Sequence, residues 1–375
     1  MRRPIATTTI GIGSNDSMIN TLEKKRTTIA DIALRAGVTK TTVSMVFRNK
    51  EGISHTTRQR VMDIAKEMKY ALFPVRQAQG KVHWGQIGFI IISKDYVPLN
   101  PNHPTPNFDF QYFSRMMHGC LAYAEENGHS TVCSSLEWKH IKSGNLSSIL
   151  KHERADGFLF RAWISPVVEE MLRKINVPVV LMDCDRYLEG YSSVHVNNIK
   201  GMDLVVEHLV KQGAKRFATI TGDMDHQNAQ ERLAGLQMAL TRRGIPLPPE
   251  GIITEPDFVD ECGRHGTRKL IESGYRFDAL VCHFDLAAYG AMEELSLAGI
   301  KVPDDVLVTG FDNEDFSDKI AIPLTTVETN SFQLGRLGAQ LLLAQTGGEK
   351  KHIIHAYPDV SLAVRKSTQV QNMSS

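Results

Sequence analysis

Residues 28–44, TIADIALRAGVTKTTVS, decide the architecture of the amino-terminal part of the chain. Apolar side chains recur at helical spacing up to Ala36, and Thr28 and Asp31 have the spacing of a capping box. Gly37 can end this helix, because glycine adopts the left-handed conformation that commonly follows a helix. The pattern therefore predicts a short helix that ends in a glycine turn.

Two more helices are expected after this turn. Thr39 can cap a helix over residues 40–47, and the apolar spacing over residues 57–70 predicts a third helix. A helix, a glycine turn and a short second helix have the spacing of a helix-turn-helix, whose second helix enters the major groove of DNA. The alternative is a generic three-helix interaction module with solvated polar faces.

The side chains of a DNA-reading segment of this kind divide into two groups. The first residues of the second helix face base edges, where lysine donates to guanine and threonine methyl groups contact thymine. The expected base-reading residues are Lys40, Thr41, Thr42 and Ser44. Phosphate contacts, which set the register but carry no sequence information, are expected from Thr28, Thr39, Ser54, Arg58 and Lys81.

The charge distribution favours an anionic partner for this segment. The 375 residues carry 43 Lys and Arg against 42 Asp and Glu, so the net charge of +1 by itself argues against nucleic-acid binding. Residues 1–85, however, hold 15 of the cations and only 6 of the anions, which gives +9 there and −8 on the remainder. A basic segment on an acidic body indicates an anionic partner, and a solvated basic tail is the alternative.

From residue 86 onward, apolar strand-like runs alternate with helical stretches. This alternation predicts an α/β core with doubly wound parallel sheets, behind the all-α helix-turn-helix domain. The core has more residues than one such sheet usually needs. The expected division is a flexible extension at 1–27, the helix-turn-helix domain at 28–70, a hinge or linker at 71–85, the core at 86–368 and a flexible tail at 369–375.

Residues 28–44 resemble the amino-terminal signature of the lactose-repressor/galactose-repressor (LacI/GalR) family, and the resemblance extends to about residue 367. The later motifs that carry it are Arg232-Leu233-Ala234-Gly235, Asp285, Gly310-Phe311-Asp312-Asn313 and Pro323-Leu324-Thr325-Thr326-Val327. The resemblance implies a transcription regulator, expected to be a repressor, with a two-lobed core like that of periplasmic binding proteins. It also implies a homodimer or higher oligomer that binds double-stranded operator DNA and a carbohydrate-like effector. The chain is expected to cross between the lobes near 188–195, 308–312 and 328–332.

Three expected DNA contacts depart from the family pattern. Met45 stands where the family usually has an arginine that reads guanine, and Arg48 stands where asparagine is usual. Gln79 falls on the position whose leucine wedges into the minor groove, and glutamine cannot supply an apolar wedge. A register shift that places Val75 or Val82 there is the alternative. We expect an altered operator.

The expected effector site lies at the carboxyl ends of the parallel strands, where such folds bind ligands. Aromatic residues there would stack on a ring and polar residues would bond its edges, and the resemblance adds Arg232 with Asp285 as a charged pair for ligand hydroxyls or carboxylates. The expected effector-binding residues are Tyr112, Phe113, Trp163, Asp183, His226, Asn228, Arg232, Phe258 and Asp285. The alternatives are plain core for the aromatic residues, a surface loop position for His226, a structural Arg232–Asp285 pair and a strand-end turn at Asp183.

Other classes of protein find less support in the sequence. The chain contains no nucleophile elbow, P-loop or zinc-protease motif, so we expect no enzyme, no catalytic residue, no cofactor and no metal site. The five widely spaced cysteines predict buried free thiols. The absence of a signal-peptide pattern and of a long apolar run favours a cytoplasmic, nucleoid-associated regulator over a periplasmic binding protein or a membrane protein. The proline-rich stretch at 96–108 either covers the cleft or the dimer face, or is a neutral insertion.

Overall fold

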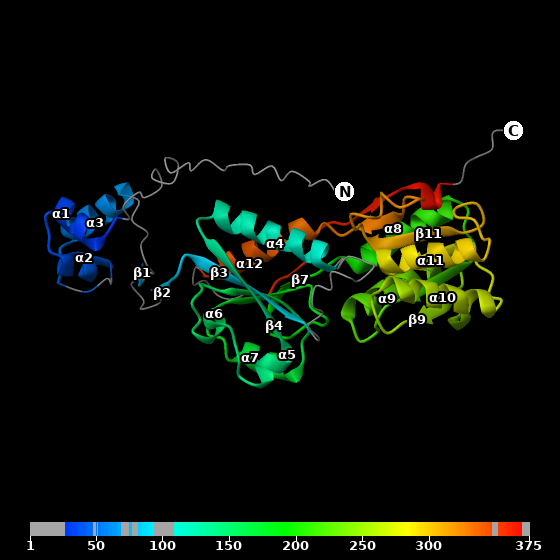
Figure 1. Cartoon of the computed structure of the whole chain (residues 1–375), viewed down its shortest axis with the longest axis horizontal. Helices are drawn as coiled ribbons and strands as arrows, with labels where there is room; N and C mark the ends of the chain where they lie inside the picture. Colours follow the sequence, from blue (N-terminus) through cyan, green and yellow to red (C-terminus); the bar gives the residue numbers. More distant parts are fainter. Residues whose placement is uncertain are drawn as a thin grey trace, which may run out of the picture. The chain divides into compact units, whose positions relative to one another are not determined.

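The computed structural model describes residues 27–47, 50, 52–68, 75–76, 82–93, 109–346 and 352–369 (Figure 1). The chain divides into two compact units, 1–84 and 85–375. Arg48, Gln79, Lys81 and the stretch 96–108 lie outside the described residues. In the described part of the chain, no helix combines the length and the apolar character that crossing a membrane requires.

The first unit contains the three helices that the sequence predicts: α1 (Ile29–Ala36), α2 (Lys40–Phe47) and α3 (His55–Glu67). The capping box is present, because the Thr28 side chain accepts from the backbone of Asp31 and the Asp31 side chain accepts from the backbone of Thr28. Gly37 follows α1 in the left-handed conformation, with φ of 64°. The three helices share a small core of fully buried side chains: Ile32, Val43, Val61 and Ala65.

Two short strands lie in the segment that the sequence predicts to be a linker. β1 (Val75–Arg76) and β2 (Val82–His83) pair antiparallel, with Val75 opposite His83 and Arg76 opposite Val82. Both alternative wedge positions, Val75 and Val82, therefore lie in extended backbone.

The second unit consists of two α/β lobes. In lobe 1, which comprises the described residues of 85–195 and 331–356, the strands form a parallel sheet in the order β13-β7-β6-β5-β3-β4. The strands are β3 (Gln86–Ser93), β4 (Ser130–Glu137), β5 (Phe158–Ala162), β6 (Val179–Met182), β7 (Ser192–Val194) and β13 (His355–Ala356). The helices are α4 (Asp109–Glu126), α5 (Trp138–Lys142), α6 (Ser148–Lys151), α7 (Pro166–Arg173) and α12 (Ser331–Thr346).

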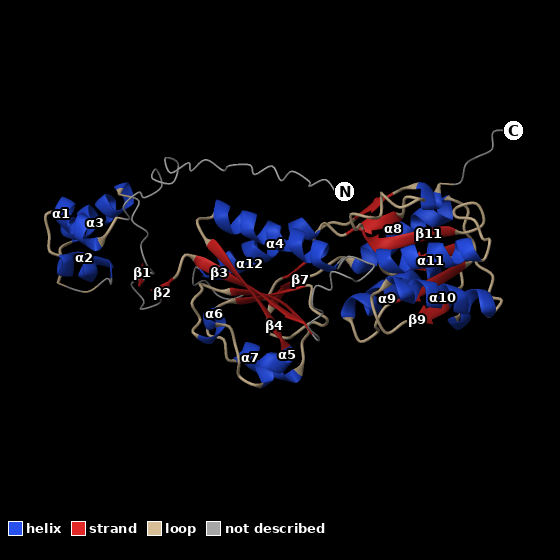
Figure 2. Ribbon diagram, in the orientation of Figure 1, coloured by secondary structure: helices blue, strands red, loops and turns tan. Residues whose placement is uncertain are grey.

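Strand β3 shows how lobe 1 builds a core on each face of its sheet. Successive side chains of a strand point to opposite faces. Ile87 and Phe89 pack on the face covered by α4 and α12, and Ile90 and Ile92 pack on the face covered by α5, α6 and α7 (Figure 2). All four are fully buried, which explains why the sequence reads as a continuous apolar run there.

Lobe 2 comprises the described residues of 198–328 and 361–369, and its strands follow the order β14-β12-β11-β10-β8-β9. The strands are β8 (Phe217–Thr221), β9 (Ile252–Thr254), β10 (Ala279–Cys282), β11 (Leu307–Asp312), β12 (Thr325–Glu328) and β14 (Ser361–Ala363), of which only β14 pairs antiparallel. The helices are α8 (Asn198–Lys211), α9 (Gln227–Thr241), α10 (Asp260–Glu272) and α11 (Asp285–Leu297), with short turns η2 (Pro249–Gly251) and η3 (Lys366–Thr368). The predicted fold class, with its two doubly wound sheets, is confirmed.

The chain crosses between the lobes at 195–197, 329–330 and 357–360, between the last element of one lobe and the first of the other. The expected crossing at 328–332 includes the observed one at 329–330, and the first crossing begins at the last residue of the expected range of 188–195. The expected crossing at 308–312 is wrong, because these residues form the interior strand β11, which pairs with β10 on one side and β12 on the other. All five cysteines are free; Cys133 is exposed and the other four are buried.

Candidate functional site

The first turn of α2 presents the residues expected to read DNA. Lys40 and Thr41 are exposed. The Thr39 hydroxyl accepts a hydrogen bond of 3.0 Å from the backbone N–H of Thr42, which fixes the start of the helix. Long or polar exposed side chains at the start of a helix can reach an external partner, as a recognition helix requires. The half-buried residues among those expected are Thr42, Ser44 and Met45.

Three of the expected phosphate contacts cap helices. Thr28, Thr39 and Ser54 each accept a hydrogen bond from a backbone N–H in the first turn of α1, α2 and α3. Free amides and the helix dipole make such termini favourable for phosphate. Arg58 donates hydrogen bonds of 3.2 and 2.7 Å to backbone carbonyls at the end of α2 and just after it, so it also holds the connection between α2 and α3.

The second group of expected site residues gathers at the junction of the two lobes. Trp163 follows β5 and Asp183 follows β6 in lobe 1, and His226 and Asn228 lie at the start of α9 in lobe 2. The carboxyl ends of parallel strands meet at one edge of a sheet, and here the two edges face one another. Asp183 is only 3% exposed and Asn228 only 8%, so the polar groups of the junction are largely removed from solvent.

Asp183 of lobe 1 binds a donor of its own lobe with one carboxylate oxygen and a donor of lobe 2 with the other. Tyr112 Oη of lobe 1 donates to Oδ2 at 2.9 Å, and Asn228 Nδ2 of lobe 2 donates to Oδ1 at 3.0 Å. Burial acts to raise the pKa of Asp183, but the nearby Arg161 guanidinium and the hydrogen bond from Asn228 outweigh it and lower the pKa. Asp183 is therefore an ionised, hydrogen-bonded bridge between lobes.

Asn198 extends this network through lobe 2. Its Nδ2 donates to Asn228 Oδ1 at 2.9 Å and to Glu231 Oε2 at 2.8 Å, and its Oδ1 accepts from Arg232 Nε at 2.9 Å. Glu231 accepts a further hydrogen bond of 2.9 Å from Tyr187 Oη of lobe 1. Side-chain hydrogen bonds thus run without interruption from one lobe to the other.

Arg232 is a buried cation within this network, with 6% of its surface exposed. Its guanidinium pairs with Asp312 Oδ1 at 2.9 Å, donates to the carbonyl of His283 and lies 3.8 Å from the centre of the Phe311 ring. The alternative of a structural Arg232–Asp285 pair is wrong, because the carboxylate that pairs with Arg232 is Asp312.

Asp285 instead faces the interior of lobe 2. It is 1% exposed, and it accepts from the hydroxyls of Ser317 and Thr326, both at 2.5 Å, and from the backbone N–H of Glu314 at 2.8 Å. Burial raises the pKa of Asp285 to about 7, although these donors act to lower it. The side chain fastens α11 to the segments that follow β11 and to β12, and its oxygens are engaged by donors of the same lobe.

Aromatic rings flank the polar network. The ring centroids of Trp163 and His226 are 6.1 Å apart, those of His226 and Phe258 5.7 Å, and those of Phe258 and Phe284 5.4 Å. Burial and, after it, the Arg161 charge lower the pKa of His226 to about 4, so the imidazole is neutral at pH 7. The junction therefore combines flat apolar surfaces with hydrogen-bonding groups.

The backbone is strained at the strand ends of the junction. Asp183 has φ of 46° and Asp312 has φ of 105°, followed by Asn313 with φ of 50°. Non-glycine residues rarely adopt positive φ, and each costs about 1–3 kcal/mol. The surrounding fold holds these residues in place, as is common where side chains are positioned for a ligand.

The structure adds junction residues that the sequence did not single out. Arg161 of β5 lies with its guanidinium carbon 4.7 Å from the centre of the Phe113 ring on α4, and Asn198, Glu231 and Asp312 belong to the network described above. Asp312 ends a predicted strand and lies within a motif of the family resemblance, so it could have been selected. Arg161 lies two residues before Trp163. Because successive side chains in extended backbone point to opposite faces, residues two positions apart point to the same face.

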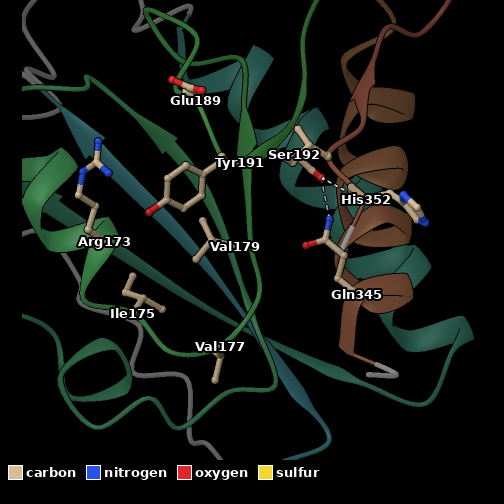
Figure 3. Close-up of a pocket in the computed structure, with 11 residues that line it drawn as sticks. Arg173, Ile175, Val177, Val179, Glu189, Tyr191, Ser192, Gln345 and His352 are labelled. Carbon is tan, nitrogen blue, oxygen red and sulfur yellow. Dashed lines mark hydrogen bonds between the residues drawn. The ribbon is translucent and has the colours of Figure 1, made fainter. Parts of the chain in front are cut away.

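A separate cavity of about 390 Å³ opens at the other edge of the lobe 1 sheet, near the amino ends of β6 and β7 (Figure 3). The apolar residues that line it include Val177 and Val179. On one side Gln345 Nε2 donates to Ser192 Oγ at 2.8 Å. None of the described lining residues is an expected effector contact, and the amino ends of the strands lie opposite the junction.

A helix-turn-helix unit together with a two-lobed parallel-sheet core defines a class of DNA-binding transcription regulators. Residues 28–71 match the family described as bacterial regulatory proteins, lacI family, and residues 206–368 match the periplasmic binding protein-like domain. The chain therefore combines a DNA-binding domain of the lacI family with a periplasmic-binding-protein-like domain.

Several relatives span nearly the whole chain. The HTH-type transcriptional repressor PurR of Aliivibrio salmonicida (strain LFI1238) is 26% identical over 91% of this chain and 98% of its own length. The HTH-type transcriptional repressor CytR of Escherichia coli (strain K12) is 27% identical over 91% of this chain and 96% of its own length. These relatives are named as transcription regulators and not as enzymes.

Solved structures show the same similarity. The structure of the lac repressor dimer bound to operator and the anti-inducer ONPF has a TM-score of 0.67 and 26% identity, and covers 92% of this chain and 100% of the repressor chain. The structure of the transcriptional regulator CelR in complex with cellobiose has a TM-score of 0.65 and 25% identity. It covers 91% of this chain and 100% of the CelR chain.

Proposed function

We propose that this chain is a repressor whose affinity for operator DNA is controlled by a carbohydrate or carbohydrate derivative bound at the junction of the lobes. The observation that carries the proposal is the network that links the lobes through Asp183 and Asn228, flanked by the rings of Trp163, His226 and Phe258. Flat rings can stack on a sugar, and carboxylates and amides can bond its hydroxyls. The CelR–cellobiose complex and the lac repressor complex support a ligand of this kind.

The network suggests how a ligand would act on the lobes. The hydrogen bonds of Asp183 and Asn228 are made within the chain and are buried, so a ligand that enters the junction must replace some of them. A ligand shifts a conformational equilibrium only through its different affinities for the two states. We propose that ligand hydroxyls take over these bonds and thereby change the angle between the lobes.

The DNA side of the proposal rests on α2 and on the capped helix termini. Lys40, Thr41 and their neighbours would read bases, and the starts of the three helices would bind phosphates. We propose that the chain acts as a dimer on a two-fold symmetric operator in the cytoplasm, as the lac repressor dimer on its operator suggests. Footprinting of a selected site should protect two symmetric half-sites, and a single asymmetric half-site would contradict the dimer.

The effector part is tested by thermal unfolding of the full chain with a panel of sugars, sugar derivatives and purines. A ligand that binds only the native state raises the melting temperature. We expect a carbohydrate to do so, and we expect Trp163→Ala to lose the shift. The control is Tyr191→Ala, which removes an aromatic residue of lobe 1 at the distant cavity and should keep the shift. If both variants respond like the wild type, the junction is not the binding site.

A further inference from the structure

Arg161 carries a charge that has no direct ionic partner in the described part of the chain. Among the described residues, its guanidinium has no hydrogen bond and no ion pair, and its Nε is buried without an acceptor. Its guanidinium carbon lies over the Phe113 ring, 4.7 Å from the ring centre. A guanidinium has five N–H donors, and a buried donor of a charged group that finds no acceptor is unfavourable.

Asp183 and Asp185 are the carboxylates whose pKa values the Arg161 charge acts to lower, and each accepts hydrogen bonds from other donors. Asp183 accepts from Tyr112 and Asn228. Asp185 Oδ1 accepts from the backbone N–H of Ile164 at 2.5 Å. Both carboxylates offset the Arg161 charge through space, but neither forms an ion pair with the planar donor fork.

Arg161 also lies where a bound sugar would present a substituent. It belongs to the carboxyl end of β5, and Trp163 follows two residues later on the same side of the chain. The Trp163 ring faces His226 of lobe 2. A sugar stacked on the exposed face of one of these rings would bring its substituents toward the guanidinium.

We propose that Arg161 binds an oxyanion of the effector, and that the effector is an acidic sugar derivative: a sugar carboxylate, phosphate or sulfate. The inference rests on the proposed function of the junction. An arginine fork matches the paired oxygens of these groups with two parallel hydrogen bonds, and the Phe113 ring supports the guanidinium plane from the other side. A neutral sugar would leave the fork without an ionic partner.

The experiment compares melting temperatures of the full chain with D-glucuronate, glucose 6-phosphate, glucose 6-sulfate, inorganic phosphate and inorganic sulfate. Glucose and sodium chloride of equal ionic strength are the controls, since phosphate and sulfate also stabilise proteins without binding a site. We expect at least one oxyanion to raise the melting temperature more than both controls do. Comparison of the carboxylate, the phosphates and the sulfates then shows which of the three groups binds. In Arg161→Met, affinity for that oxyanion should fall about 10- to 100-fold.

Arg161→Lys is the matched variant, because it keeps the charge and loses the fork. Arg161→Lys should retain part of the affinity for the oxyanion. It also replaces Arg161→Met as the test variant if Arg161→Met does not fold. The proposal is overturned if no oxyanion exceeds the sodium chloride control, or if wild type and Arg161→Met respond equally. A neutral sugar whose shift is lost in Trp163→Ala but kept in Arg161→Met would overturn this inference and leave the proposed function intact.

Discussion

The ion pair of Arg232 and Asp312 offers a sharp test of how the junction is built. The variant Arg232→Met removes a cation that is only 6% exposed, together with its bonds to Asn198, Asp312 and the carbonyl of His283. The methionine retains apolar contact with Phe311 but takes the Arg232 charge away from the partly buried Asp312 carboxylate. Breaking a buried pair in this way costs about 3–5 kcal/mol.

The double variant Arg232→Met/Asp312→Asn separates the pair from the rest of the packing. Asparagine removes the negative charge and tolerates the positive φ of this position at least as well as aspartate. We expect the double variant to recover about 2 kcal/mol of the loss seen in the single variant. Urea unfolding of the full chain, followed by circular dichroism at pH 7, measures both differences. If the double variant is as unstable as Arg232→Met, the ion pair is not what Arg232 contributes.

Three further outcomes follow from particular residues. Because Asp285 has a pKa of about 7 in the fold against an ordinary value of 3.8, the folded protein holds a proton between these values that the unfolded chain releases. Its free energy of unfolding should therefore fall with rising pH across this window, by up to about 1.4 kcal/mol per pH unit relative to Asp285→Asn in urea titrations, and parallel pH profiles would refute this. A Cβ at Gly335 would overlap the Met116 carbonyl where α12 meets α4, so Gly335→Ala should cost about 1–3 kcal/mol in the same assay, and a neutral substitution would refute the close packing. In gel-shift assays, Lys40→Ala should lose about 1–3 kcal/mol on the selected operator and relax one base position, whereas Lys66→Ala, on the exposed last turn of α3, should do neither; an unchanged preference in Lys40→Ala removes it as a reader.

The parts of the fold that the sequence predicts are those with strong local signals. Thr28, Asp31 and Gly37 define the ends of α1 by hydrogen-bonding capacity and by backbone conformation, which neighbouring residues alone determine. The interior strands are apolar runs, because both faces of a parallel sheet are buried. These signals require no knowledge of residues far away in the chain.

The elements that the sequence does not predict lack such signals. β4 (Ser130–Glu137) is an edge strand whose side chains are mostly half-buried or exposed, so its sequence, STVCSSLE, shows no apolar run. The expected crossing at 308–312 is wrong because no local signal in the sequence marks where the chain passes from one lobe to the other. The crossing lies instead at 357–360, between the short strands β13 and β14.

The candidate site shows the same division. The sequence predicts which residues follow a strand, and for this reason it predicts Trp163 and Asp183 as effector-binding residues. The partner of a side chain depends on three-dimensional packing: the carboxylate beside Arg232 is Asp312, and Asp285 turns into its own lobe. The lack of an acceptor for Arg161 Nε among the described residues is likewise a property of the assembled junction, which no local pattern in the sequence predicts.

The central claim is that a ligand at the junction of the lobes controls the affinity for DNA. Fluorescence anisotropy of a labelled operator, selected from random DNA, measures the Kd with and without the ligand found by thermal unfolding. We predict that the ligand changes the Kd of the wild type at least about 5-fold, the lower range of allosteric coupling. Trp163→Ala should bind the same operator with unchanged Kd and show no response to the ligand. An equal response in both proteins, or none in the wild type, would contradict the account.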